Sequence, residues 1–162
     1  ALGKPIDVAP LLTLPPRSKL PLVLKWLIPL LIVLLLTIGF FKGGTQHSIE
    51  SISIWILVNG VFSALGVSLA LAHPLTILSA FVAAPLTSLN PTIAAGWVSG
   101  LVQAWVKKPK VADLESLPQA LGSIRLFWLN PVCRILLVVL LANLGSSFGT
   151  FVAGSWIAAR LL

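Results

Sequence analysis

A long stretch without a formally charged residue constrains this chain more than any other feature. No Asp, Glu, Lys or Arg occurs between Ser51 and Val106. This run is longer than one membrane span requires, because about 20 apolar residues cross a bilayer as a helix. The His-Pro pair at 73–74 and the Asn-Pro pair at 90–91 divide it, and proline fits the first turn of a helix. The stretch therefore predicts two or three apolar helices in succession.

The composition of the whole chain excludes a water-soluble globular domain. Hydrophobic residues make up 57% of the 162 residues, charged residues 9%, and the mean hydropathy is +1.04. Soluble domains carry about 25% charged residues. The net charge of +7 comes from basic residues that flank apolar runs, which indicates membrane orientation and no nucleic-acid partner. The lone Cys133 excludes an internal disulfide framework and a multi-thiolate metal site.

We predict an all-α polytopic membrane protein in which residues 20–162 form a helical transmembrane domain. It has three long spans, a short-helix hairpin at 74–106 and an interfacial helix. The predicted helices cover about 21–41, 51–72, 74–89, 91–106, 111–128 (the surface helix) and 131–159. Residues 42–50 are predicted as a polar turn, and Pro85 is expected to kink or break the helix at 74–89. The sequence leaves open whether the 74–106 hairpin is re-entrant or forms two short spans.

The surface helix at 111–128 is predicted from apolar residues that recur at steps of three and four. A loop that packs on the bundle from the soluble side is the alternative reading of the same segment. These apolar residues are Leu114, Leu117, Leu121, Ile124 and Trp128.

Residues 1–19 are rich in proline and are predicted as a basic linker. The chain contains no Met and opens with Ala1, so we expect a processed chain or a fragment that a domain precedes. Nine of the eleven basic residues lie before the first span or in 107–134, which predicts a multi-pass cell-membrane protein with a cytoplasmic N-terminus.

Small residues recur every four positions on three of the predicted helices. In lipid, helices associate through close backbone approach, which such residues permit. The sequence leaves open whether the stripes pack within the chain or against another copy in a homo-oligomer. The stripes are Gly60, Ala64, Ser68 and Ala72; Gly96, Gly100 and Ala104; and Gly145, Gly149 and Ala153.

Uncharged polar residues inside the predicted spans form a candidate polar path. They could line a route for a solute, or they could be hydrogen bonds between helices. No acidic residue lies inside a span, which argues against a proton relay or a cation pump. The candidate residues are Asn59, Asn90, Gln103, Asn143, Ser146 and Ser147.

The sequence gives little support for a catalytic site. The chain has no His-Glu-x-x-His motif and no pair of membrane aspartates. A serine type would have to pair Ser146 or Ser147 with His73, which is predicted to lie half a membrane away. His73 and Cys133 could approach each other, but two ligands do not make a zinc site. We therefore expect no enzyme activity, no catalytic or cofactor-binding residue, no metal and no cofactor in this chain.

The segment from His73 to Leu117 contains the run NPTIAAGWVSGLVQAWVKKPKVADLE, and a later run reads FWLNPVCRILLVVLLANLGSSFGT. Over residues 20–155 the chain resembles the C-terminal membrane region of the TraB/PrgY family, which is related to pheromone shutdown. The resemblance implies that a soluble N-terminal domain normally precedes this region and holds any activity of the family. The function expected is to anchor that cytoplasmic-side domain in the lipid bilayer and to oligomerise it. A pore or transporter core around the 74–106 hairpin is the alternative.

Overall fold

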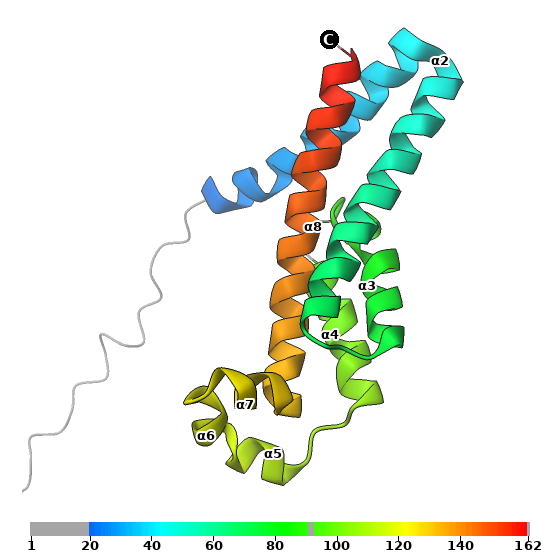
Figure 1. Ribbon diagram of the computed structural model, residues 1–162. Coiled ribbons are helices and arrows are strands. Elements are labelled where there is room, and N and C mark those ends of the chain that lie inside the picture. The colour runs from blue at the N-terminus through cyan, green and yellow to red at the C-terminus, as the bar shows by residue number, and fades with distance from the viewer. Residues whose placement is uncertain (1–19, 91–92, 162) are drawn as a thin grey trace, which may run out of the picture.

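The computed structural model describes residues 20–90 and 93–161, and within these ranges all regular secondary structure is helical (Figure 1). The predicted all-α class is therefore confirmed. The linker predicted at 1–19 lies outside the described residues. The helices are α2 (Leu20–Leu69), α3 (Pro74–Thr87), α4 (Ala95–Val106), α5 (Val111–Glu115), α6 (Leu117–Leu121), α7 (Ile124–Leu129) and α8 (Pro131–Leu161).

Helix α2 is a helical hairpin whose two arms meet at Gly44. The backbone of Gly44 has φ 72° and ψ −170°, a conformation that glycine adopts without strain. The chain reverses there, at the end of the molecule that also holds the C-terminus (Figure 1). The polar turn predicted over 42–50 is thus wrong in extent, because one glycine makes the reversal and helix resumes directly after it. The helix predicted over 21–41 is the first arm, which continues to Gly44. The helix predicted over 51–72 is the second arm, which begins at Gly44 and ends at Leu69.

Within the described residues, two helical segments are long and apolar enough to cross a membrane. They are Gly44–Leu69, with 26 residues, and Pro131–Arg160, with 30 residues. The prediction of three long spans is therefore wrong for the first of them. Its apolar part, Trp26–Lys42, falls in the class of shorter apolar helices, because Lys25 and Lys42 bound the uncharged run.

Helices α3 and α4 form a hairpin that covers half the length of α8 (Figure 1). Ser88, at the end of α3, lies 3.0 Å from the hydroxyl of Ser146, which is near the middle of α8. The α3–α4 tip therefore turns back halfway along the two long helices. A hairpin of this depth is compatible with the re-entrant alternative of the prediction.

Helix α3 begins as predicted at Pro74, and the side chain of His73 accepts a hydrogen bond from the Leu75 amide. Pro85 does not break the helix, which continues to Thr87 instead of the predicted residue 89. Proline lacks the amide that would bond to the carbonyl of Phe81. That carbonyl faces Gly60, where an added Cβ would lie 2.8 Å from the Phe81 oxygen.

The helix predicted from residue 91 starts later than predicted, and residues 91 and 92 lie outside the described residues. Helix α4 begins at Ala95, and the Ala94 before it is extended. The first turn is capped from another helix, because Asn143 Oδ1 accepts the Gly96 N–H at 2.8 Å. A cap supplied by α8 has no local sequence signal.

The single surface helix predicted over 111–128 is also wrong, since three short helices occupy the segment. Helix α5 ends at Glu115, and Pro118 lies in the first turn of α6. Gly122 follows α6 and the extended Ser123 precedes α7. The apolar spacing persists across these breaks, but proline and glycine interrupt the hydrogen-bond ladder.

Helix α8 begins at the predicted Pro131 and ends two residues beyond the predicted 159. Asn130 Oδ1 accepts hydrogen bonds from the amides of Val132 and Cys133, the arrangement of a helix N-cap. The start of this helix is confirmed.

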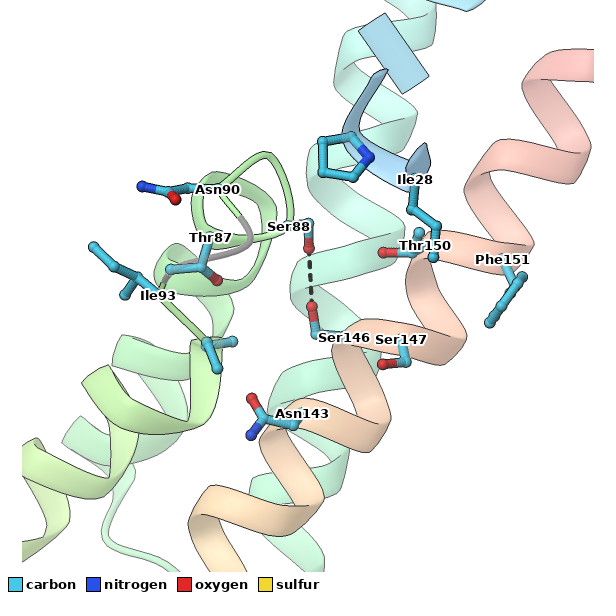
Figure 2. Close-up of a pocket in the computed structure, with 13 residues that line it drawn as sticks. Ile28, Thr87, Ser88, Asn90, Ile93, Asn143, Ser146, Ser147, Thr150 and Phe151 are labelled. Carbon is cyan, nitrogen blue, oxygen red and sulfur yellow. Dashed lines mark hydrogen bonds between the residues drawn. The ribbon is translucent and has the colours of Figure 1, made fainter. Parts of the chain in front are cut away.

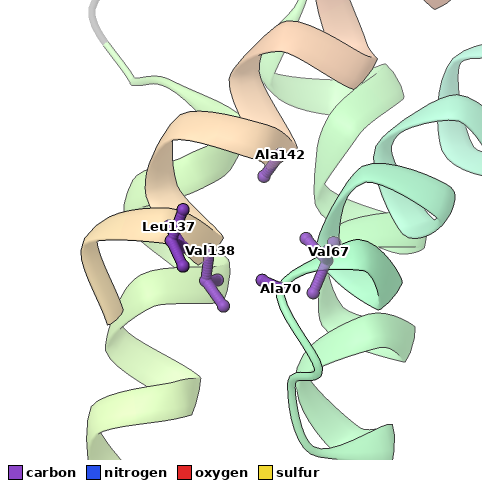
Figure 3. Close-up of a cluster of buried hydrophobic side chains, with 6 residues drawn as sticks. Val67, Ala70, Leu137, Val138 and Ala142 are labelled. Atoms are coloured by element: carbon purple, nitrogen blue, oxygen red, sulfur yellow. The ribbon is translucent and has the colours of Figure 1, made fainter. Parts of the chain in front are cut away.

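The interior consists of two clusters of buried hydrophobic side chains between α2 and α8. In the first cluster, Val67 of α2 and Ala70, just after α2, lie opposite Leu137, Val138 and Ala142 of α8 (Figure 3), and Ala80 of α3 completes it. A second cluster, towards the Gly44 end, joins both arms of α2 to α8. It consists of Ile32, Trp55, Ala153 and Ile157.

Candidate functional site

A polar cluster lies between the hairpin tip and the middle of the two long helices. Asn59 of α2, which is fully buried, donates through Nδ2 to Ser88 Oγ at 2.9 Å and to Thr150 Oγ1 at 3.0 Å. Its Oδ1 accepts the Ser146 hydroxyl at 2.9 Å. Ser88 Oγ also donates to the Ala84 carbonyl at 2.7 Å. The amide of Asn59 thus has its donors and its acceptor occupied, and it joins α2 to the hairpin and to α8.

Next to this cluster lies an open cavity of about 290 Å³ (Figure 2). The first arm of α2, the hairpin tip and α8 enclose it, and Ile28, Pro29 and Phe151 supply apolar wall. Its polar lining carries only hydroxyl and amide groups. These belong to Thr87, Ser88, Asn90, Asn143, Ser146, Ser147 and Thr150.

Among the described residues that line this wall, none is ionisable, so the described wall offers no charge opposite to that of a charged ligand. The first turn of α4 faces the cavity through Ala94 and Ala95, but the Gly96 amide is already bonded to Asn143. The cavity can therefore accept hydrogen-bonding neutral molecules, water included, beside an apolar surface.

The predicted polar path is divided between two places. Asn90, Asn143, Ser146 and Ser147 line the cavity, and Asn59 bonds to its wall. Gln103 lies instead at the base of the hairpin, where it is 1% exposed. Its Oε1 accepts the His73 amide at 3.1 Å and the Thr76 hydroxyl at 2.8 Å.

The predicted polar path did not include the other residues of the cavity wall, which are Ile28, Pro29, Thr87, Ser88, Ile93, Ala94, Ala95, Thr150 and Phe151. Thr87 is an ordinary helical threonine by sequence. The first arm reaches the cavity because the chain reverses at Gly44. No local sequence pattern indicated that this arm would lie beside the hairpin.

The glycines of the predicted stripes lie against neighbouring helices of the same chain. A Cβ on Gly149 would lie 2.6 Å from Asn59 Cα, and one on Gly145 would lie 2.8 Å from the Phe62 carbonyl carbon. A Cβ on Gly100 would lie 2.5 Å from Val139 Cγ2, and Gly96 faces the Val139 carbonyl.

The alanine and serine members of the stripes differ in burial. Ala153 is fully buried in the second cluster. The others are partly buried, namely Ala64, Ser68, Ala72 and Ala104.

The described residues hold no group of three or more His, Cys, Asp or Glu side chains placed to bind a metal. His73 caps α3 at the base of the hairpin, whereas Ser146 contacts its tip, so α3 separates the two. Cys133 is buried in the first turns of α8.

The geometry defines a class: an all-helical domain with two membrane-length helices and a half-length hairpin against them. The family model for the C-terminal domain of TraB family proteins matches residues 20–162, and the chain belongs to this family. An uncharacterized protein of Methanocaldococcus jannaschii is 42% identical over 99 residues, which are 60% of this chain. The matched part is 25% of that protein's length. No solved structure matches the chain.

Proposed function

We propose that this domain anchors a larger TraB-family protein in a cell membrane. The supporting observation is the exposure of large apolar side chains along the two membrane-length helices. Only 28% and 33% of their most apolar stretches are buried, whereas the core helix of a soluble protein would be mostly buried. Exposed leucines and phenylalanines at this density need a hydrocarbon environment, because a contiguous apolar surface of this size is unfavourable in water. The length of the Methanocaldococcus relative supports a larger whole protein.

The orientation belongs to the same proposal. Lys107, Lys108 and Lys110 lie at the end of the bundle where α8 begins, and Lys42 and Arg160 lie at the opposite end. Because basic residues are enriched on the cytoplasmic side, the α8 start faces the cytoplasm and the C-terminus faces outward. The expected cytoplasmic N-terminus lies in the residues outside the described ranges.

Quenching of tryptophan fluorescence by lipids with brominated acyl chains tests the embedding. Trp97, on the outer face of α4, is 61% exposed, and Trp55 is 3% exposed. In vesicles, a variant that retains only Trp97 is expected to be strongly quenched. The matched variant that retains only Trp55 is expected to be quenched weakly. Equal quenching of both variants, or none in either, would contradict the proposal.

The glycines of the stripes pack within the chain, since Gly60, Gly100 and Gly145 are covered by side chains or backbone of the same chain. This packing favours a homo-oligomer, which the sequence left open, that uses other surfaces, such as the outer face of α4 with Leu101 and Trp105.

A second candidate function, passage of a small uncharged polar solute, is favoured by the cavity at the hairpin tip. Its hydroxyl and amide lining at half the length of α8 would replace the hydration of such a solute. We expect glycerol flux into liposomes to be reduced by Asn90→Leu and by Ser147→Leu, because both fill the cavity with apolar atoms. Thr37→Val on the first arm, outside this cavity, is the control. Liposomes that stay impermeable with the wild-type chain would remove this candidate.

A further inference from the structure

The short helices α5, α6 and α7 form a layer across the end of the bundle where α8 begins (Figure 1). Hydrogen bonds to α2 and to the start of α8 hold this layer in place. Asn130 Nδ2, before α8, donates to the Asp113 carbonyl at 2.8 Å and so ties α5 to α8. Trp128 Nε1 donates to the Leu69 carbonyl at 3.0 Å and so ties α7 to the end of α2. We call residues 107–129 the platform.

The three short helices of the platform expose large apolar side chains. Each of the three helices has five or six residues, too few to be stable without packing partners. Yet Ile124 is 82% exposed, Val111 72% and Leu121 70%. Short amphipathic helices of this kind are stabilised when their apolar side chains enter the boundary between headgroups and acyl chains.

The platform also carries an excess of exposed positive charge. Lys107, Lys108 and Lys110 are exposed within four positions of one another, and Arg125 is exposed on α7. The structure records no salt bridge for these four cations among the described residues, whereas Arg160 at the other end pairs with Glu50 at 3.1 Å. Of the two acidic side chains here, Asp113 is engaged by the Lys110 amide at 2.7 Å.

We propose that the platform lies in the headgroup layer of one leaflet and binds anionic phospholipid through Lys107, Lys108 and Lys110. This inference rests on the proposed membrane anchoring and adds the class of lipid. Clustered lysines beside exposed apolar residues attract anionic headgroups, and the cytoplasmic leaflet has the negative surface potential to supply them. Trp105, which is 71% exposed one turn before these lysines, lies where aromatic side chains settle at the interface.

Native mass spectrometry of the full chain in a neutral detergent tests the proposal, with phosphatidylglycerol and phosphatidylcholine as probes. We expect the wild-type chain to bind phosphatidylglycerol about tenfold or more tightly than phosphatidylcholine, because each lysine near anionic headgroups contributes. The double substitution Lys107→Gln/Lys108→Gln is expected to remove most of this preference. Both side chains are exposed, so the fold should tolerate the change.

The matched control is Lys42→Gln/Arg160→Gln, which removes the same number of charges from the opposite end. We expect it to retain the preference. Loss of preference in both variants, or no preference in the wild type, would overturn the platform proposal. Raising the salt from 0.1 to 1 M shortens the screening length from about 10 to about 3 Å and should collapse the preference in the wild type. The quenching experiment reports membrane embedding separately, so a chain that embeds without preferring anionic lipid would refute the platform alone.

Discussion

Gly145→Ala is expected to lower the free energy of unfolding by about 1–3 kcal/mol, the range that overpacking a close contact costs. A Cβ at this position would lie 2.8 Å from the Phe62 carbonyl carbon and 2.8 Å from Ser63 Cα. Both are backbone atoms, so no side-chain rotation can make room, and α2 and α8 must move apart. Titration with a denaturing detergent in mixed micelles, followed by circular dichroism, measures the change.

Gly154→Ala on the same helix is the matched control. Nothing lies within 4 Å of a Cβ added at Gly154. Alanine has the higher helix propensity, so this variant should be neutral or slightly more stable, by up to about 1 kcal/mol. Equal stability of the two variants would show that the α2–α8 contact at Gly145 is looser than the structure has it.

The packing of α2 shows how far the small-residue pattern could predict the contacts. An α-helix turns about 100° per residue, so residues four apart drift around its axis. Over the stripe, Gly60 and Ala72 point about 120° apart. The buried face of the arm instead passes through Asn59, Ser63, Val67 and Ala70, which keeps closer to one side. Gly60 is buried next to Asn59, but the later members of the stripe are only partly buried.

Gly66 is the packing glycine that the stripes missed. A Cβ there would lie 3.0 Å from the Leu141 carbonyl carbon. Its spacing to Ala70 is also four residues, so the signal was present on a neighbouring line of the helix. Sequence periodicity identified the helices that pack through small residues. Which row of small residues faces the partner helix depends on how that helix packs, and periodicity does not give this.

The start of a helix could be predicted where the capping residue is adjacent in sequence, and not where the cap comes from another helix. The starts at Pro74 and Pro131 were predictable, because the capping residues His73 and Asn130 directly precede them. The start of α4 was not, because its acceptor is Asn143, almost fifty positions further along the chain. The cavity depends on the same contacts between distant segments. Several of its polar residues could be listed from the sequence, but their position around one cavity could not be predicted.

Asn59→Leu is expected to destabilise the domain by about 2 kcal/mol. Three hydrogen bonds are lost, to Ser88, Thr150 and Ser146. Bonds between helices in membrane proteins contribute about 0.6 kcal/mol each on average. Leucine has similar volume, so the loss of polar contacts dominates, and the hairpin tip loses its connection to α2. Thr37→Val is the control, since Thr37 bonds to the Val33 carbonyl of its own helix and is exposed.

A double-mutant cycle separates the network from a simple loss of packing. Ser146→Ala removes one partner of Asn59, and the combination with Asn59→Leu should cost less than the sum of the single changes. The two side chains share a 2.9 Å bond, and residues in one network couple by about 0.5 kcal/mol or more. The same detergent titration supplies all four free energies. Strict additivity would mean that the bond between Asn59 and Ser146 does not stabilise the domain, and the polar contribution of Asn59 would then come from its bonds to Ser88 and Thr150.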